Sequence, residues 1–168
     1  MKQAIVIFIK KNKDIDRIRK KYDPYYKKFK SHITLAFPFE NISQKELYNH
    51  IKKSLYGINS FKMTLQGVRK SPKEYYLYLL VKKGKKEILK IHKRFYLRLL
   101  TKYLRKDIPY IPHITLGIFK TKKEIDSALR ELKDKKLKIK ATVDSVYLIN
   151  LNKDSSLKSY KQFWFSRV

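Results

Sequence analysis

The chain has 168 residues, of which 43% are hydrophobic and 14% aromatic, and 42 Lys and Arg against 14 acidic residues give a formal net charge of +28. This apolar content is enough to build a core and excludes an intrinsically disordered chain. The absence of cysteine excludes disulfides and thiolate chemistry, and no apolar run approaches the length of a membrane span. The apolar run near the N-terminus is too short for a signal peptide, so we expect a cytoplasmic protein.

The first half of the chain is predicted to alternate strands with helices. The apolar run 4–9 favours a central strand, and the segment 14–21, with its acidic start, favours a short helix. The segment 32–37 favours a second strand that Pro38 would stop. Apolar residues repeat every four positions over 43–57, and Ser43 and Glu46 have capping-box spacing, so a helix is predicted there.

The second half is predicted to open with a hairpin and to end in strands. The runs 61–68 and 75–81 flank a Ser-Pro turn and indicate antiparallel pairing. The longest helix is expected over 85–104, with its apolar residues on one stripe. The remaining elements are predicted to be a strand at 113–119, a helix at 121–134 with Thr121 and Glu124 as a capping box, and strands over 139–151 and 162–168.

The resulting order, β-α-β-α-β-β-α-β-α-β-β, predicts an α+β fold in one bilobal domain over residues 1–168. We expect two lobes related by an approximate two-fold axis, each with an antiparallel-rich sheet and helices packed outside. The active-site cleft would lie between the lobes, and terminal strands are free to cross from one lobe to the other.

A repeated tetrapeptide is the main functional signal. The sequence His-Ile-Thr-Leu occurs at 32–35 and again at 113–116, although the chain holds only four histidines. Composition gives a chance recurrence with a probability of roughly one in a thousand, which indicates an internal repeat. A structural repeat without chemistry is the alternative.

Side chains alternate between the two faces of a strand, so the histidine and the threonine of each copy should share a face. The polar faces are expected to carry His32, Thr34 and Ala36 in the first copy and His113, Thr115 and Gly117 in the second. The core faces are expected to carry Ile33, Leu35 and Phe37, and Ile114, Leu116 and Ile118. The small residues at the third polar position would leave room for a ligand above the sheet.

Two imidazoles and two hydroxyls across a cleft suit in-line displacement at phosphorus. One histidine, titrating near neutrality, can activate the nucleophile as a base, and the other can protonate the leaving oxygen. The hydroxyls of Thr34 and Thr115 can donate hydrogen bonds to the non-bridging phosphate oxygens. This interpretation makes His32 and His113 the catalytic residues.

Other kinds of site have less support in the sequence. Neither copy is accompanied by the further ligands that a metal site needs, and no Gly-rich phosphate loop or Ser-His-Asp grouping is visible. We therefore expect neither a metal nor a cofactor. His50 and His92 lie within predicted amphipathic helices and are interpreted as partly exposed helix residues.

The two His-x-Thr-x motifs, about eighty residues apart on strands of a bilobal α+β fold, resemble those of the two-histidine (2H) phosphoesterase superfamily. That group includes LigT-like 2′-5′ RNA ligases and cyclic phosphodiesterases. The resemblance implies that His32 and His113 are catalytic and that Thr34 and Thr115 bind phosphate. It also implies metal-independent hydrolysis of 2′,3′-cyclic phosphates or 2′-5′ linkages, and in some members ligation. LigT-like members would carry a basic residue soon after the second threonine, whereas the nearest base here is Lys120.

The positive charge favours RNA or a nucleotide as the partner, with a monomeric protein and no membrane contact. The alternative is that the basic residues form a solvated surface that binds no nucleic acid, and that the many lysines partly reflect an AT-rich genome. A non-catalytic RNA-binding module also remains open, with the aromatic and lysine-rich segment 20–30 as its best exposed candidate. A third hypothesis is a cyclic phosphodiesterase that acts on small molecules. The sequence does not show which bond is cleaved, which histidine is the general base, which product isomer forms or how long the substrate is.

Overall fold

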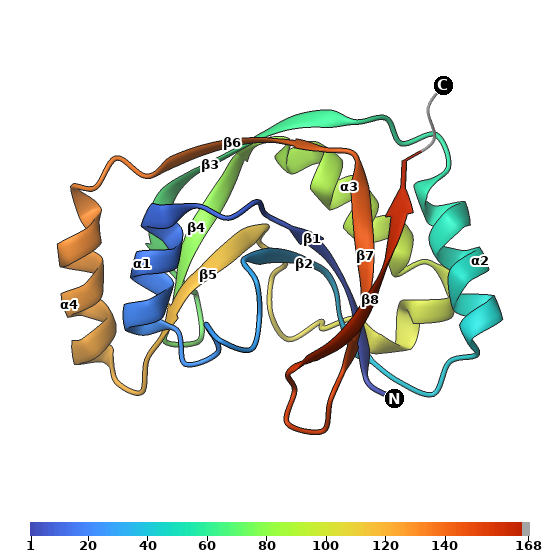
Figure 1. The fold of residues 1–168 in the computed structure, drawn as a ribbon, viewed down its shortest axis with the longest axis horizontal. Coiled ribbons are helices and arrows are strands. Elements are labelled where there is room, and N and C mark those ends of the chain that lie inside the picture. Colours follow the sequence, from blue (N-terminus) through green and yellow to red (C-terminus); the bar gives the residue numbers. More distant parts are fainter. Residues whose placement is uncertain (166–168) are drawn as a thin grey trace.

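The computed structural model describes residues 1–165, which form two four-stranded antiparallel sheets and four α-helices (Figure 1). The first sheet has the order β2-β1-β7-β8 and the second the order β5-β4-β3-β6. The strands are β1 (Gln3–Phe8), β2 (His32–Phe39), β3 (Phe61–Lys70), β4 (Tyr76–Lys83), β5 (His113–Ile118), β6 (Lys138–Val143), β7 (Ser145–Leu151) and β8 (Leu157–Trp164). The helices are α1 (Lys13–Tyr22), α2 (Gln44–Leu55), α3 (Lys85–Phe95), the 3₁₀ helix η1 (Arg98–Tyr103) and α4 (Lys122–Lys133).

The two motif strands are the edge strands of the two sheets. β2 and β5 lie side by side in the middle of the molecule, with one sheet extending away on each side (Figure 1). Helix α1 follows a strand of the first sheet but packs on β5 of the second, and α3 packs on β2 of the first. This arrangement confirms the predicted bilobal α+β fold, with helices outside and chain segments that cross between the lobes.

Helices α1 and α4 form as the sequence predicts. The Thr121 hydroxyl accepts from the Glu124 N–H and the Glu124 carboxylate accepts from the Thr121 N–H, so this capping box is confirmed. The other predicted capping box is wrong, because the Ser43 side chain makes no capping bond at the start of α2.

The single long helix predicted over 85–104 is also wrong. Helix α3 ends at Phe95, and Arg98 adopts a φ of 63°, a left-handed conformation that cannot continue an α-helix. The Tyr96 hydroxyl accepts the backbone N–H of Phe37 in β2. This tertiary contact fixes the end of α3 where periodicity alone would extend it.

The strands differ from the predicted ones in two places. Pro38 does not stop β2, which runs to Phe39, since proline is tolerated in an edge strand where its nitrogen needs no ladder partner. The segment 139–151 divides at Asp144 into β6 of one sheet and β7 of the other. The last predicted strand corresponds to the end of β8, and residues 166–168 lie outside the described residues.

Both motif strands contain a bulge directly after the threonine. On β2 the pairing with β1 advances from Thr34 to Ala36 over one step of the partner, and on β5 the pairing with β4 advances from Thr115 to Gly117 in the same way. The bulge reverses the alternation of faces. The predicted faces are therefore wrong beyond the fourth motif residue: Ala36 and Gly117 are buried, whereas Phe37 and Ile118 are half-buried and line the clefts described below.

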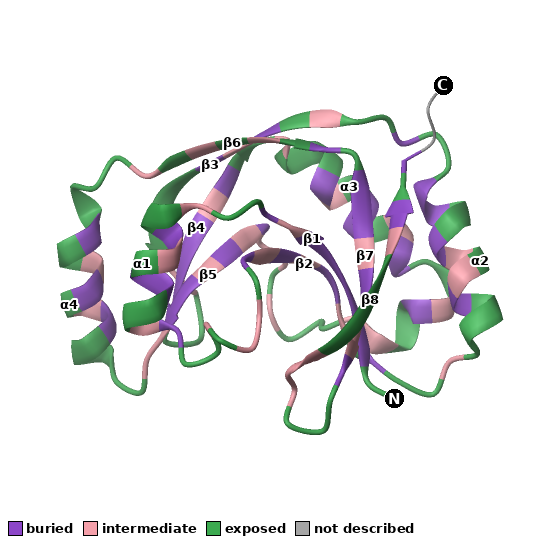
Figure 2. Ribbon diagram, in the orientation of Figure 1, coloured by how far each residue is buried: buried purple, intermediate pink, exposed green. Residues whose placement is uncertain are grey.

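A continuous apolar core joins the two lobes, and each of the four α-helices contributes buried residues (Figure 2). Gly117 of β5 lies against Tyr22 of α1. A Cβ at this position would lie 2.7 Å from the Tyr22 Cβ and 3.0 Å from the Phe119 ring. The small residue of the second motif therefore allows helix packing and does not make room for a ligand.

Replacing Gly117 with Ala should destabilise the fold by about 1–3 kcal/mol, because neither the Tyr22 Cβ nor the strand can move without disturbing the core. Urea denaturation measures the change. Ser127→Ala on the exposed part of α4 is the control and should leave the free energy of unfolding nearly unchanged. An equally stable Gly117→Ala protein would contradict this account of the packing.

Candidate active site

The two motif histidines have the same backbone anchor. His32 and His113 are the first residues of β2 and β5, and each Nδ1 lies within hydrogen-bond distance of the carbonyl oxygen two residues earlier, that of Lys30 and that of Ile111. A carbonyl oxygen only accepts, so each Nδ1 must carry the proton and donate it. The Nε2 atom of each neutral ring then carries a free lone pair. It can act as a base or, once protonated, as an acid.

The structure brings the four predicted site residues to two adjoining clefts. Thr34, His113 and Thr115 line a cleft of about 260 Å³. His32 and Thr115 line a second cleft of about 340 Å³, and Tyr76 borders both. The two clefts share Thr115 and Tyr76, so the four residues line adjoining spaces between the edge strands β2 and β5.

Burial lowers the pKa of both histidines. The pKa of His113 is lowered to about 4, mainly by desolvation and in smaller part by the nearby His32, and the hydrogen bond to the Ile111 carbonyl partly offsets the shift. Desolvation also lowers the pKa of His32, and the Lys30 carbonyl partly offsets it. Without a bound anion, both rings are therefore neutral at pH 7.

Aromatic rings wall the cleft on the side of the second motif. The Tyr78 ring stacks on His113 with centroids 3.4 Å apart and planes 19° apart, so it shields one face of the imidazole from water. The Tyr110 hydroxyl donates to the Thr34 carbonyl at 2.7 Å and so connects the segment before β5 to β2. Burial raises the pKa of Tyr78 and of Tyr110, so both hydroxyls keep their protons.

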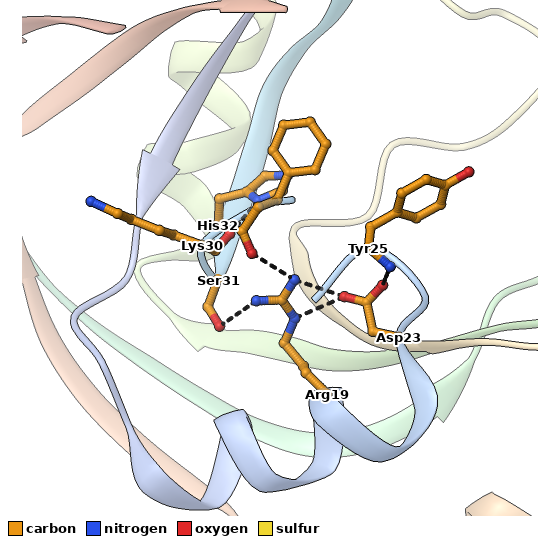
Figure 3. Close-up of polar contacts among 7 residues, drawn as sticks. Arg19, Asp23, Tyr25, Lys30, Ser31 and His32 are labelled. Atoms are coloured by element: carbon orange, nitrogen blue, oxygen red, sulfur yellow. Dashed lines mark hydrogen bonds and ion pairs between the residues drawn. The ribbon is translucent and has the colours of Figure 1, made fainter. Parts of the chain in front are cut away.

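A buried ion pair supports the loop that leads to His32 (Figure 3). The Arg19 guanidinium donates twice to one oxygen of Asp23, at 2.7 and 2.9 Å, and both side chains are only 4% exposed. The same guanidinium donates to the Ser31 hydroxyl and to the Phe29 carbonyl, both at 3.1 Å. One planar cation therefore fastens the end of α1 to the residue just before the catalytic candidate.

Several residues of this site carried no signal in the sequence. Arg105 and Lys73 line the first cleft. Lys120, the basic residue that follows the second motif most closely in the sequence, is exposed and donates its backbone N–H to Glu124. Arg19 and Tyr78 were likewise not predicted. Arg19 falls on the apolar stripe of α1 next to Ile18, and a charge on a buried stripe is the one cue that could have identified it.

The other two histidines serve the structure. His50 bonds the Phe95 carbonyl, and His92 bonds the Leu35 carbonyl while its ring stacks on Tyr110 at 3.5 Å. His92 is buried, so its predicted partial exposure is wrong. His92 therefore supports β2, the first motif strand, through the Leu35 carbonyl.

The aromatic segment 20–30 contributes to the second cleft. Tyr25, which is 44% exposed, and Phe29 line this cleft beside His32. Tyr22 instead packs on Phe119. The segment is therefore only partly the exposed surface that the sequence suggested.

Within residues 1–165, no three His, Asp or Glu side chains lie close enough together to hold a metal ion. Over the same residues, no helix is both long and apolar enough to cross a membrane.

Comparison with known proteins gives one family and several similar folds. The family model described as the 2'-5' RNA ligase superfamily matches residues 9–155. The chain resembles the crystal structure of TT0787 from Thermus thermophilus, with a TM-score of 0.63 and 14% identity over 98% of each chain. It also resembles E. coli LigT complexed with 3'-AMP and with NADP+, with TM-scores of 0.62 and 0.59 and 14% identity in both cases, over 99% of this chain and 98% of that one. No curated protein sequence matches the chain.

The buried ion pair makes a stability prediction. Replacing Asp23 with Asn leaves the Arg19 charge buried without a counterion and should cost about 3–5 kcal/mol of unfolding free energy. Asp14→Asn removes the exposed Arg17 pair, whose side chains are 73% and 62% exposed, and should change little. Denaturant unfolding compares the two variants, and equal losses would contradict the role of burial.

Proposed function

The chain belongs to the 2'-5' RNA ligase superfamily, and on that premise we propose that it is a metal-independent phosphoesterase acting on RNA or nucleotides. The proposed reaction is hydrolysis of a 2′,3′-cyclic phosphate or of a 2′-5′ phosphodiester. In the related 2′-5′ ligation, a 5′-hydroxyl in place of water opens the cyclic phosphate. The observation that carries the proposal is the placement of His32 and His113 at adjoining clefts, with both Nδ1 atoms held by backbone carbonyls.

The proposed mechanism divides two proton transfers between the histidines. One neutral Nε2 takes a proton from water as the water oxygen attacks phosphorus. The other ring, protonated at Nε2, gives its proton to the ribose oxygen as the phosphorus–oxygen bond to that atom breaks. The product is a phosphomonoester with a free neighbouring hydroxyl. In ligation, a ribose 5′-hydroxyl replaces water as the nucleophile.

The remaining cleft groups stabilise negative charge in this proposal. Thr34 and Thr115 donate hydrogen bonds to the non-bridging oxygens, and Arg105, which pairs with Asp107, lines the first cleft beside them. Tyr25 and Phe29 offer rings on which a base can stack beside His32. The net charge of +28 supports a polyanionic substrate, and crystals of E. coli LigT with 3'-AMP and NADP+ show that a protein of this fold holds nucleotides.

Replacing either His32 or His113 with Ala should lower turnover of a 2′,3′-cyclic nucleotide by a factor of about a hundred or more, because acid–base catalysis is lost. Activity is measured with chelator present, and the wild-type rate should not change. His50→Gln is the control, since His50 bonds only the Phe95 carbonyl.

Full activity in both alanine variants would overturn the proposal. Tight RNA binding with a steep salt dependence and no turnover of cyclic or 2′-5′ substrates would establish a non-catalytic RNA-binding module instead.

The pH dependence of kcat/KM should be a bell with its maximum below 6.5, the ordinary pKa of histidine. The active form carries one proton on the pair, and this form is most populated midway between the two pKa values, both of which burial lowers. A bound phosphate anion raises the pKa of the protonated ring, so the kcat optimum should lie at higher pH than that of kcat/KM. A kcat/KM optimum above pH 7 would contradict the burial of the two rings.

A further inference from the structure

A larger cavity, of about 1010 Å³, lies between the end of β1 and the exposed face of β3 and β6. Three lysines stand on this face: Lys62 from β3, and Lys138 and Lys140 from β6. Each is paired across the β3–β6 ladder with a threonine or a glutamine, so charged and neutral side chains alternate over the sheet. The face therefore offers positive charge without placing two lysines directly opposite each other.

Four more lysines border the same cavity, namely Lys82 and Lys83 at the end of β4 and Lys10 and Lys11 after β1. Asp144 is the single acidic residue among the lining side chains, and within residues 1–165 none of the seven lysines lies within ion-pair distance of a carboxylate. We call this cavity, with its seven lysines, the lysine groove. Its uncompensated charge suits a ligand with several negative charges.

One end of the lysine groove is aromatic. Phe8 and Tyr147 line it, with ring centroids 4.8 Å apart. Tyr160, which is 51% exposed, meets both rings edge-on at 5.7 Å. The Lys30 ammonium lies 5.9 Å from the Phe8 centroid and 5.6 Å from that of Tyr160. Rings beside ammonium groups are the pattern on which the bases and phosphates of a single strand bind.

The aromatic end adjoins the candidate active site. Phe8 is directly opposite His32 in the β1–β2 pairing, and residues opposite each other point to the same face, with Cβ atoms about 4.5–5.5 Å apart. A strand that continued from a phosphate at His32 over Phe8 and Tyr147 would reach the lysines. A mononucleotide would occupy only the beginning of this path.

We propose that the lysine groove binds single-stranded RNA that continues from the reacting phosphate. On a strand with a 2′,3′-cyclic end, the remaining nucleotides lie on the 5′ side of that end, so the groove takes these nucleotides. A single strand repeats a phosphate for the lysines and a base for the rings at every nucleotide, whereas an acidic protein has no such repeat. The inference rests on the proposed function for its direction along the strand, and its binding part is measured separately.

The test compares the triple variant Lys62→Gln, Lys138→Gln, Lys140→Gln with a control of equal charge. The control, Lys45→Gln, Lys52→Gln, Lys53→Gln, neutralises three exposed lysines of α2. Binding of a labelled eight-nucleotide oligouridylate is followed by fluorescence anisotropy from 50 to 300 mM salt. The groove variant should bind about tenfold or more weakly, with a salt slope shallower by about 2, since each lost phosphate contact in a single strand contributes about 0.7. The control should match the wild type.

Kinetics on cyclic-ended oligonucleotides of one to eight residues complete the test. The wild-type kcat/KM should rise with length, and the groove variant should lose about tenfold in the ratio of octamer to mononucleotide. Turnover that is independent of length, with unchanged octamer binding, would overturn the groove and leave the phosphoesterase standing. Groove-dependent octamer binding without any turnover would support the groove and overturn the proposed enzyme. Equal competition by polyglutamate and by unlabelled RNA would overturn the assignment to RNA.

Discussion

The cleft depends on one repeated contact, the hydrogen bond from each motif Nδ1 to the backbone carbonyl two residues before it. This bond fixes the tautomer, and it turns both Nε2 atoms into the groups that can exchange protons. Each carbonyl belongs to the segment that enters the motif strand, so the imidazole is held by backbone at the point where the strand begins. The arrangement needs no carboxylate to orient either ring.

The two motif strands are built alike, but the neighbours of the His32 and His113 rings differ. Both motif strands are edge strands with a bulge after the threonine, and each is covered by a helix that crosses from the other half of the chain. His113, however, stacks on Tyr78, whereas His32 follows the loop that the Arg19–Asp23 pair supports. The two rings therefore have different neighbours, although burial lowers the pKa of both.

The sequence predicted the elements and the repeat because these depend on local pattern. Apolar periodicity located the helices and strands, and the tetrapeptide located four residues of the candidate site. It could not predict the bulges after Thr34 and Thr115, because a bulge is decided by the partner strand. Nor did it identify Tyr78, whose stacking on His113 joins residues that are distant in the chain, or Arg19, whose only cue was a charge on the apolar stripe of α1. The break of α3 likewise follows from a bond between Tyr96 and β2 that periodicity does not record.

Nitrogen NMR of the histidine side chains tests the central claim most directly, because it observes the tautomers themselves. At neutral pH, His32 and His113 should both be neutral rings protonated at Nδ1 with a free Nε2. Saturating uridine 2′-monophosphate should convert one of the two into an imidazolium. Neutral rings protonated at Nε2 in both positions would contradict the account. So would two rings whose protonation does not change when uridine 2′-monophosphate binds.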